Sequence, residues 1–144
     1  MQHHLFHQRF VAQSDQLRQV REWVRDTAMS CGMSEEQACR VVIGVNEACM
    51  NIITHAYRDC SGDIELDILQ DQADLIFQLT DFASTMDCSR IKSRDLSDIR
   101  PGGLGVHFIQ EVMDEVSYLP GSNDSGNVVI MKVRIKVQGA GHGM

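Results

Sequence analysis

The chain has 144 residues, which suffices for one domain that buries roughly two-thirds of its unfolded surface, and we expect a single domain over 1–144. Its net charge of −7 argues against a protein that tracks nucleic-acid phosphates, since such proteins depend on clustered Lys and Arg. Its five cysteines indicate neither a disulfide framework nor a tetrahedral zinc site, because they are odd in number and form no C-x-x-C pair.

The first half of the chain predicts one strand followed by two helices. Apolar residues alternate over 5–11, as in a strand, and Ser14 is expected to cap the first helix, which ends at Cys31-Gly32. The segment Ser34-Glu-Glu-Gln37 is a capping box that opens a longer second helix, closed over 57–62. The expected core stripe of this second helix is Ala38, Val42, Val45, Cys49, Ile52 and Ala56.

The middle of the chain predicts a hairpin and then a lid. Alternating apolar residues over 64–68 and 75–79, with a polar turn at 70–74, are typical of two antiparallel strands. Residues from about 84 to 102 are polar and show no clear periodicity, so they are the candidate for a mobile lid.

The last third predicts a helix and two more strands. Apolar residues recur at helical spacing over 108–113, and strands are expected at 116–119 and 129–137, before a flexible tail at 138–144. The resulting order, β-α-α-β-β-lid-α-β-β, predicts an α+β fold: a two-layer α/β sandwich with a mixed, largely antiparallel sheet and the helices on one face.

Polar side chains gather on one side of the second helix. Glu47, Asn51 and His55 follow one another at i,i+4 steps, so a carboxylate, an amide and an imidazole project together. A carboxylate that accepts a proton, one turn from an amide oxygen that binds a hard cation, suits Mg-assisted phosphoryl transfer. Alone, each residue is more often an ordinary solvated or packing side chain.

Gly44 lies in the same sector of this helix. A glycine inside a helix costs about 1 kcal/mol relative to alanine, so something must favour it there. A ligand lying close to the backbone and a crowded helix crossing are equally good explanations at this point.

Asp81 is expected on the same face of its strand as Leu75, Phe77 and Leu79, because strand residues two apart point to the same side. An unpaired carboxylate on that face would cost several kcal/mol, so Asp81 needs a hydrogen-bond donor. The exocyclic amine of adenine is one such donor, and a backbone N–H of a neighbouring loop is the structural alternative.

The run Gly102-Gly103-Leu104-Gly105 precedes the third predicted helix. Exposed N–H groups and the helix dipole favour phosphate at such a helix start, although the plain interpretation is a flexible turn. Its position downstream of Glu47, Asn51 and Asp81 favours the phosphate interpretation.

The histidines outside this constellation receive no role from the sequence. His3, His4 and His7 could bind a metal, but the sequence places no cysteine or carboxylate beside them, so a strand or a disordered start is the favoured interpretation. His107 interrupts an apolar helix and is expected to be a half-exposed packing residue.

The sequence resembles the gyrase and histidine-kinase ATPase superfamily, the Bergerat fold. Over nearly the whole chain, the likeness follows that superfamily's N, G1 and G2 boxes, which match Asn46-Glu47-x-x-x-Asn51, Asp81 and Gly103-x-Gly105. Within the superfamily, the short length and the run 103–118 most resemble the anti-sigma factor serine/threonine kinases.

This resemblance implies roles for the site residues. Glu47 matches the general base, Asn51 the Mg ligand and Asp81 the residue that reads adenine. The segment Gly102-Gly103-Leu104-Gly105 matches the phosphate turn beside the lid, and His55 matches a cofactor-side position of less certain role. The expected cofactors are therefore ATP and Mg.

The resemblance also implies partners and a location. Such proteins are cytoplasmic homodimers that hold a sigma factor and phosphorylate a STAS-domain antagonist, with no nucleic acid or membrane as a direct partner. The absence of any run of about 18 apolar residues agrees with this expectation. Ala83 and Thr85 stand where the family commonly has glycine, so the alternative is a weak or inactive module that acts by sequestration alone.

Overall fold

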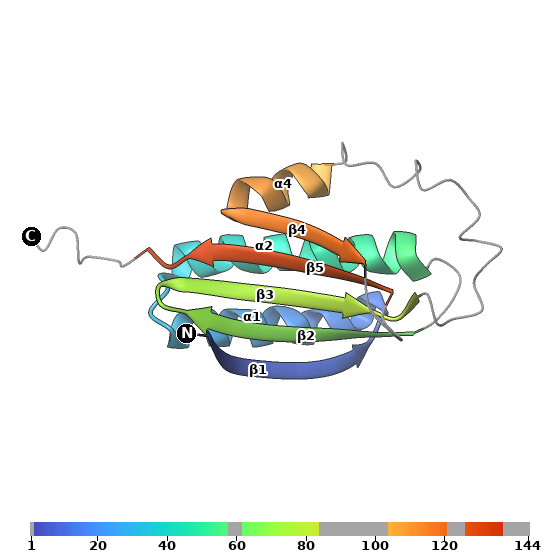
Figure 1. Ribbon diagram of the computed structural model, residues 1–144, viewed down its shortest axis with the longest axis horizontal. Coiled ribbons are helices and arrows are strands. Elements are labelled where there is room, and N and C mark those ends of the chain that lie inside the picture. The colour runs from blue at the N-terminus through green and yellow to red at the C-terminus, as the bar shows by residue number, and fades with distance from the viewer. Residues whose placement is uncertain (1, 58–61, 84–103, 121–125, 137–144) are drawn as a thin grey trace, which may run out of the picture.

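A computed structural model describes residues 2–57, 62–83, 104–120 and 126–136 of the chain, with the side chains of 104–107 excluded. Five strands form one sheet in the order β1-β2-β3-β5-β4, and α1 and α2 lie together behind it in Figure 1. The predicted α+β two-layer sandwich is confirmed. Every ladder between the described strands is antiparallel, so the parallel pairing that a mixed sheet would contain is not found among them. The strands are β1 (Gln2–Val11), β2 (Asp63–Asp71), β3 (Asp74–Asp81), β4 (Glu115–Pro120) and β5 (Asn127–Arg134).

The first helix begins later than the sequence predicts. Ser14–Gln16 forms a 3₁₀ turn, and α1 runs over Leu17–Ser30 with Gln16 as its N-cap. No side chain caps this helix, so the role expected for Ser14 is wrong: the 3₁₀ turn separates its hydroxyl from the first α-helical N–H groups. The end is as predicted, since Gly32 adopts a φ of 97°, a conformation that suits glycine.

The second helix, α2, runs over Glu35–Asn51, and half of its predicted capping box forms. The Ser34 hydroxyl accepts a hydrogen bond from the Gln37 N–H at 3.1 Å. The Gln37 side chain does not turn back to Ser34. Its amide instead donates to the Arg134 carbonyl at 2.8 Å and accepts from the Lys136 N–H at 3.0 Å, which ties the start of α2 to the end of β5.

The core lies between α1, α2 and the inner face of the sheet. Of the core stripe predicted for the second helix, Ala38, Val45, Cys49 and Ile52 are buried, whereas Val42 and Ala56 are only half-buried. The buried stripe is therefore rotated slightly toward Val41, Gly44 and Ala48. The sheet contributes alternating residues, as period-2 patterning predicts: Ile64, Leu66, Ile68, Leu75, Phe77, Leu79, Met131 and Val133.

A third helix, α4 (Leu104–Val112), packs against α2 above β4 in Figure 1. A Cβ placed on Gly44 would lie 3.3 Å from the Met113 Cε and 3.5 Å from a Val112 methyl group. The structure thus favours the crowded helix crossing over a nearby ligand as the reason for this glycine.

The hairpin turn is tighter than expected. Strands β2 and β3 are joined by two residues, and Gln72 there has a φ of 59°. The expected lid at about 84–102 and the expected tail at 138–144 both lie wholly outside the described residues.

Candidate functional site

A cavity of about 430 Å³ lies between the end of α2 and strands β3, β4 and β5. Its volume falls in the range of small-molecule sites. Most of its walls are aliphatic, and the polar lining residues are few: Asn51, His55, Asp81, Tyr118 and Asn127. Three of the residues predicted from the sequence, Asn51, His55 and Asp81, therefore share one cavity, although Asn51 ends α2, His55 lies on the segment that follows it and Asp81 ends β3.

Asp81 is the most buried ionisable residue of this group, with 2% of its surface exposed. Its Oδ1 accepts hydrogen bonds from the Ala83 N–H at 3.1 Å and the Asn127 N–H at 3.2 Å. The expected need for a donor is confirmed, and backbone N–H groups supply it, one just after β3 and one at the start of β5. Because Asp81 also lines the cavity, its carboxylate is held in a fixed orientation at the cavity wall.

Tyr57 fixes the end of β3 next to Asp81, and sequence reasoning gave it no such role. Its hydroxyl donates to the Asp63 carbonyl and accepts from the Phe82 N–H, both at 2.7 Å. Burial raises the pKa of this phenol to about 12. The ring packs so closely on the backbone of Gly62 that a Cβ there would clash with it.

The helix that carries these residues widens at the cavity. Beyond Asn51, residues Ile52–Tyr57 continue as a π-helix rather than as the expected α-helix. Such segments are frequent at functional sites. His55 lies on this segment, and its Nδ1 is buried with no hydrogen-bond partner among the described residues. A buried polar atom at a cavity wall suits a ligand that completes its hydrogen bonding.

Glu47 lies one helical turn before Asn51 and is half-buried. It is not among the described residues that line the cavity, so the structure does not bring it together with Asp81. The i,i+4 spacing still places it beside Asn51 on the same helix face. Its neighbour Asn46 is engaged elsewhere, since its side-chain oxygen accepts a hydrogen bond from Arg21 at 3.0 Å.

The predicted glycine turn is only partly within the described residues. Gly102 and Gly103 lie outside them, whereas Leu104 and Gly105 form the start of α4. The N-terminus of this nine-residue helix presents backbone N–H groups that suit an anion.

The loop after Asp81 follows a path that alanine tolerates. Among the described residues other than glycine, only Gln72 has a positive φ, so Ala83 pays no cost for a left-handed conformation. Ala83 is buried, and its N–H serves Asp81. Thr85, the second departure from the family pattern, lies outside the described residues.

Comparison with known proteins gives a consistent picture. Residues 10–133 match the family described as histidine kinase-like ATPase domain. Serine-protein kinase RsbW of Halalkalibacterium halodurans is 30% identical over 130 residues, which cover 83% of this chain and 76% of that protein. Serine-protein kinase RsbW of Bacillus subtilis is 28% identical over 132 residues, or 83% of this chain and 79% of that protein. Among the described residues, no helix combines the length and apolar character needed to cross a membrane.

Proposed function

Because the chain belongs to the histidine kinase-like ATPase domain family, with serine-protein kinases RsbW among its relatives, we propose that it is an ATP-dependent serine/threonine protein kinase. The observation that carries the proposal is the shared cavity of Asn51, His55 and Asp81. The resemblance noted in the sequence, to the anti-sigma factor serine kinases, is supported by these relatives.

The cavity fits the base of ATP. Its aliphatic walls suit the flat faces of a purine, and Asp81 offers a buried carboxylate that would accept a hydrogen bond from the exocyclic amine. His55 Nδ1, which lacks a partner among the described residues, gives a second polar point on the same wall. We assign these two residues to nucleotide binding.

The phosphate side of the site is proposed from chemistry. The Asn51 side-chain oxygen is the kind of hard ligand that Mg²⁺ prefers, and the start of α4, with Gly102-Gly103-Leu104-Gly105, would hold phosphate oxygens. Bound Mg-ATP supplies the phosphoryl group and part of the charge neutralisation. The chain's own residues orient it and exclude water.

Glu47 is proposed as the general base. It lies one turn from Asn51 on α2, so it would stand near the metal side of the site rather than the adenine side. There it would take the proton from the serine or threonine hydroxyl of the protein substrate as that oxygen attacks phosphorus.

The partners follow from the same family membership. We propose that a homodimer of this chain binds a sigma factor in the cytoplasm and phosphorylates a STAS-domain antagonist, which otherwise releases the sigma factor. The support is the identity to serine-protein kinases RsbW over most of the chain.

A second function rests on the loop after Asp81. The carboxylate already accepts hydrogen bonds from the backbone N–H groups of Ala83 and Asn127, and Ala83 occupies a position where the family commonly has glycine. A module with little nucleotide affinity would then act by partner sequestration alone. Thermal unfolding with and without Mg-ATP separates the two, since ligand at 100 times its Kd adds about 2.7 kcal/mol of stability.

Phosphoryl transfer tests the proposed kinase directly. The full chain is incubated with Mg, labelled ATP and a STAS-domain antagonist, and label on the antagonist is counted. We expect Glu47→Gln to lower the transfer rate by at least 100-fold without changing ATP affinity. Glu36→Gln, an exposed carboxylate at the start of the same helix, is the matched control and should transfer at the wild-type rate.

Two results would overturn parts of this proposal. Full transfer by Glu47→Gln would remove Glu47 from its role. An unlabelled antagonist with a wild-type chain that binds ATP would leave sequestration as the function.

A further inference from the structure

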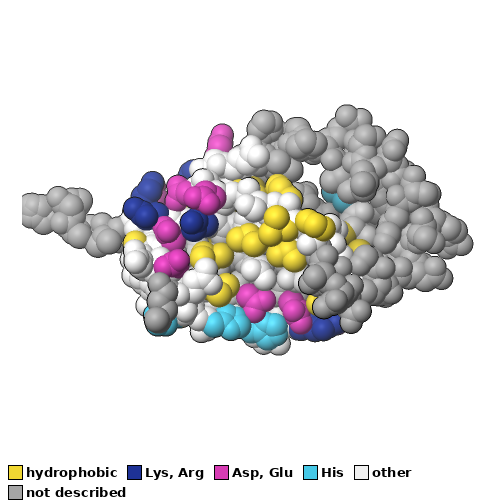
Figure 2. Space-filling view, viewed as in Figure 1, with side chains coloured by type: hydrophobic (Ala, Val, Ile, Leu, Met, Phe, Trp, Pro, Cys, Tyr) yellow, Lys and Arg dark blue, Asp and Glu magenta, His cyan; other side chains and the backbone are white. Residues whose placement is uncertain are grey.

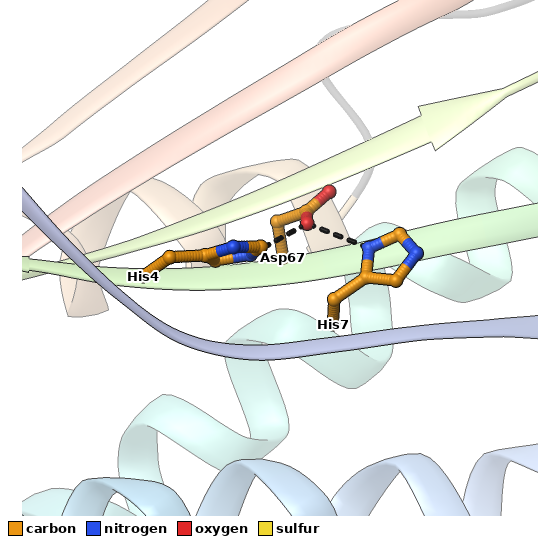
Figure 3. Close-up of side chains that lie close together, drawn as sticks. All are labelled: His4, His7 and Asp67. Atoms are coloured by element: carbon orange, nitrogen blue, oxygen red, sulfur yellow. Dashed lines mark hydrogen bonds and ion pairs between the residues drawn. The ribbon is translucent and has the colours of Figure 1, made fainter.

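His4 and His7 converge on one carboxylate from a distant part of the chain. His4 Nε2 lies 2.9 Å and His7 Nδ1 lies 2.7 Å from the Asp67 Oδ1 (Figure 3). The expectation that these histidines lack a carboxylate partner is therefore wrong, because pairing of β1 with β2 places Asp67 opposite His7. The cluster lies on the sheet face away from α1 and α2, where Figure 2 shows histidine and acidic side chains side by side.

A β-bulge is what allows both imidazoles to reach Asp67. Residues three apart in a regular strand point to opposite faces of the sheet. The ladder shifts between His4 and Phe6, since His4 pairs with Leu69 and Phe6 with Ile68. Leu5 is the extra, unpaired residue of this bulge, and it shifts the alternation by one position, so His4 and His7 point to the same face of the sheet.

The bulge also leaves the inner face of β1 intact. The Phe6 and Phe10 rings lie 5.4 Å and 6.0 Å from the Trp23 ring, between the strand and α1. Aromatic packing on one side thus holds the strand while the histidines occupy the other.

We propose that His4, His7 and Asp67 bind one divalent transition-metal ion of the Zn²⁺ class. Their ligand atoms all lie within 4.8 Å of one another. A tetrahedral ion with bonds of about 2.0–2.1 Å needs ligand atoms roughly 3.3 Å apart, so the two His–Asp67 contacts must lengthen by about half an ångström. The His4 and His7 side chains are 52% and 49% exposed, which leaves them free to make that adjustment.

The donor set selects the class of metal. Two imidazole nitrogens and one carboxylate oxygen suit Zn²⁺, Co²⁺ or Ni²⁺, whereas Mg²⁺ prefers oxygen ligands throughout. The site is therefore distinct from the Mg site proposed at Asn51. Three protein ligands leave the fourth position to water.

Metal binding would stabilise the pairing of the edge strand β1 with β2. Among the described strands, β1 pairs with β2 alone, and two of the three ligands come from β1. An ion that joins His4 and His7 to Asp67 ties this edge to the interior of the sheet, and it stabilises only the folded chain, where the three ligands meet.

Calorimetric titration of the metal-free full chain with Zn²⁺, in millimolar Mg²⁺ and without nucleotide, tests the proposal. We expect one ion per chain, and at least tenfold weaker binding for His7→Gln, His4→Gln and Asp67→Asn. His3→Gln is the matched control, since it removes a histidine from the adjacent position on β1, which alternation points to the opposite face. Zn²⁺ should raise the Tm of the wild type and of His3→Gln by several degrees, and that of the other three variants much less.

Co²⁺ provides an independent readout. Its visible absorption band reports nitrogen and oxygen coordination in the wild type and should be lost in His4→Gln. Wild-type chain that binds no Zn²⁺ overturns the proposal. So does equal weakening by His3→Gln, which would indicate loose chelation by the chain start, or undiminished binding by Asp67→Asn. Circular dichroism of each variant confirms that it is folded, and none of these results depends on kinase activity.

Discussion

Single hydrogen bonds hold the end of β3 in place at the cavity wall. Asp81 accepts hydrogen bonds from backbone N–H groups there, and the Tyr57 hydroxyl bridges the Asp63 carbonyl and the Phe82 N–H. Burial of Asp81 could be predicted from strand parity because its neighbours alternate. The Tyr57 bridge could not, since it joins the end of a helix to two strands and leaves no period in the sequence.

Replacement of Tyr57 by phenylalanine should destabilise the fold. The ring would stay buried, but the Phe82 N–H and the Asp63 carbonyl would lose their partner, which costs about 1–3 kcal/mol. Urea unfolding measures the loss, and Tyr118→Phe, where the ring is exposed, should change stability by less than about 0.5 kcal/mol. Equal stability of the wild type and Tyr57→Phe would show that water replaces the bridge at no cost.

At the scale of elements, periodicity predicted most of what the structure contains. The helices and strands appear in the predicted order because their apolar residues repeat at 3.6 or 2 positions. The ends of the helices were less predictable from periodicity. A 3₁₀ turn that begins at Ser14 precedes α1, and α2 passes into a π-helix at Ile52. Both departures depend on packing against other elements, which the local sequence does not encode.

The crossing of α2 and α4 predicts how Gly44 responds to substitution. Gly44→Ala should change stability by less than about 1 kcal/mol, because the gain in helix propensity offsets a 3.3 Å contact with the flexible end of Met113. Gly44→Leu should cost about 1–3 kcal/mol, since its side chain would force the helices apart. Chemical unfolding checks both, with Ile43→Leu as the exposed neighbour for comparison. A stable Gly44→Leu variant would contradict the close crossing.

At the scale of the whole molecule, pairing between distant segments lies beyond local patterns. The sequence indicated the two-layer α+β class, but nothing in it placed β5 between β3 and β4, or β1 at the edge beside β2. Those pairings create both proposed sites. Asp81 reaches Asn127 across the β3–β5 ladder, and His7 reaches Asp67 across the β1–β2 ladder.

Alkaline pH should unfold the protein through two buried groups. Burial raises the pKa of Cys49 from 9.0 to about 12 and that of Tyr57 from 10.0 to about 12. As the pH rises, the unfolded chain therefore loses these two protons before the folded chain does. The free energy of unfolding is highest below pH 9 and falls as the pH rises toward 12. The fall is about 1.4 kcal/mol per pH unit for each of the two groups. Urea unfolding at pH 8 to 11 measures the fall, and Cys49→Ala should lessen it between pH 9 and 10. A flat profile in the wild type would contradict the burial of both groups.

Calorimetric binding of Mg-ATP to the wild type and to Asp81→Asn tests most directly whether this cavity is a nucleotide site. The single side-chain oxygen of asparagine can still accept the Ala83 and Asn127 N–H groups. Its NH₂ group replaces the second carboxylate oxygen and cannot accept a hydrogen bond from the adenine amine. Loss of that hydrogen bond, about 1.5–3 kcal/mol, predicts roughly 10- to 100-fold weaker binding, while Asp26→Asn on the exposed face of α1 binds like the wild type. Equal affinity of Asp81→Asn and the wild type would contradict the account.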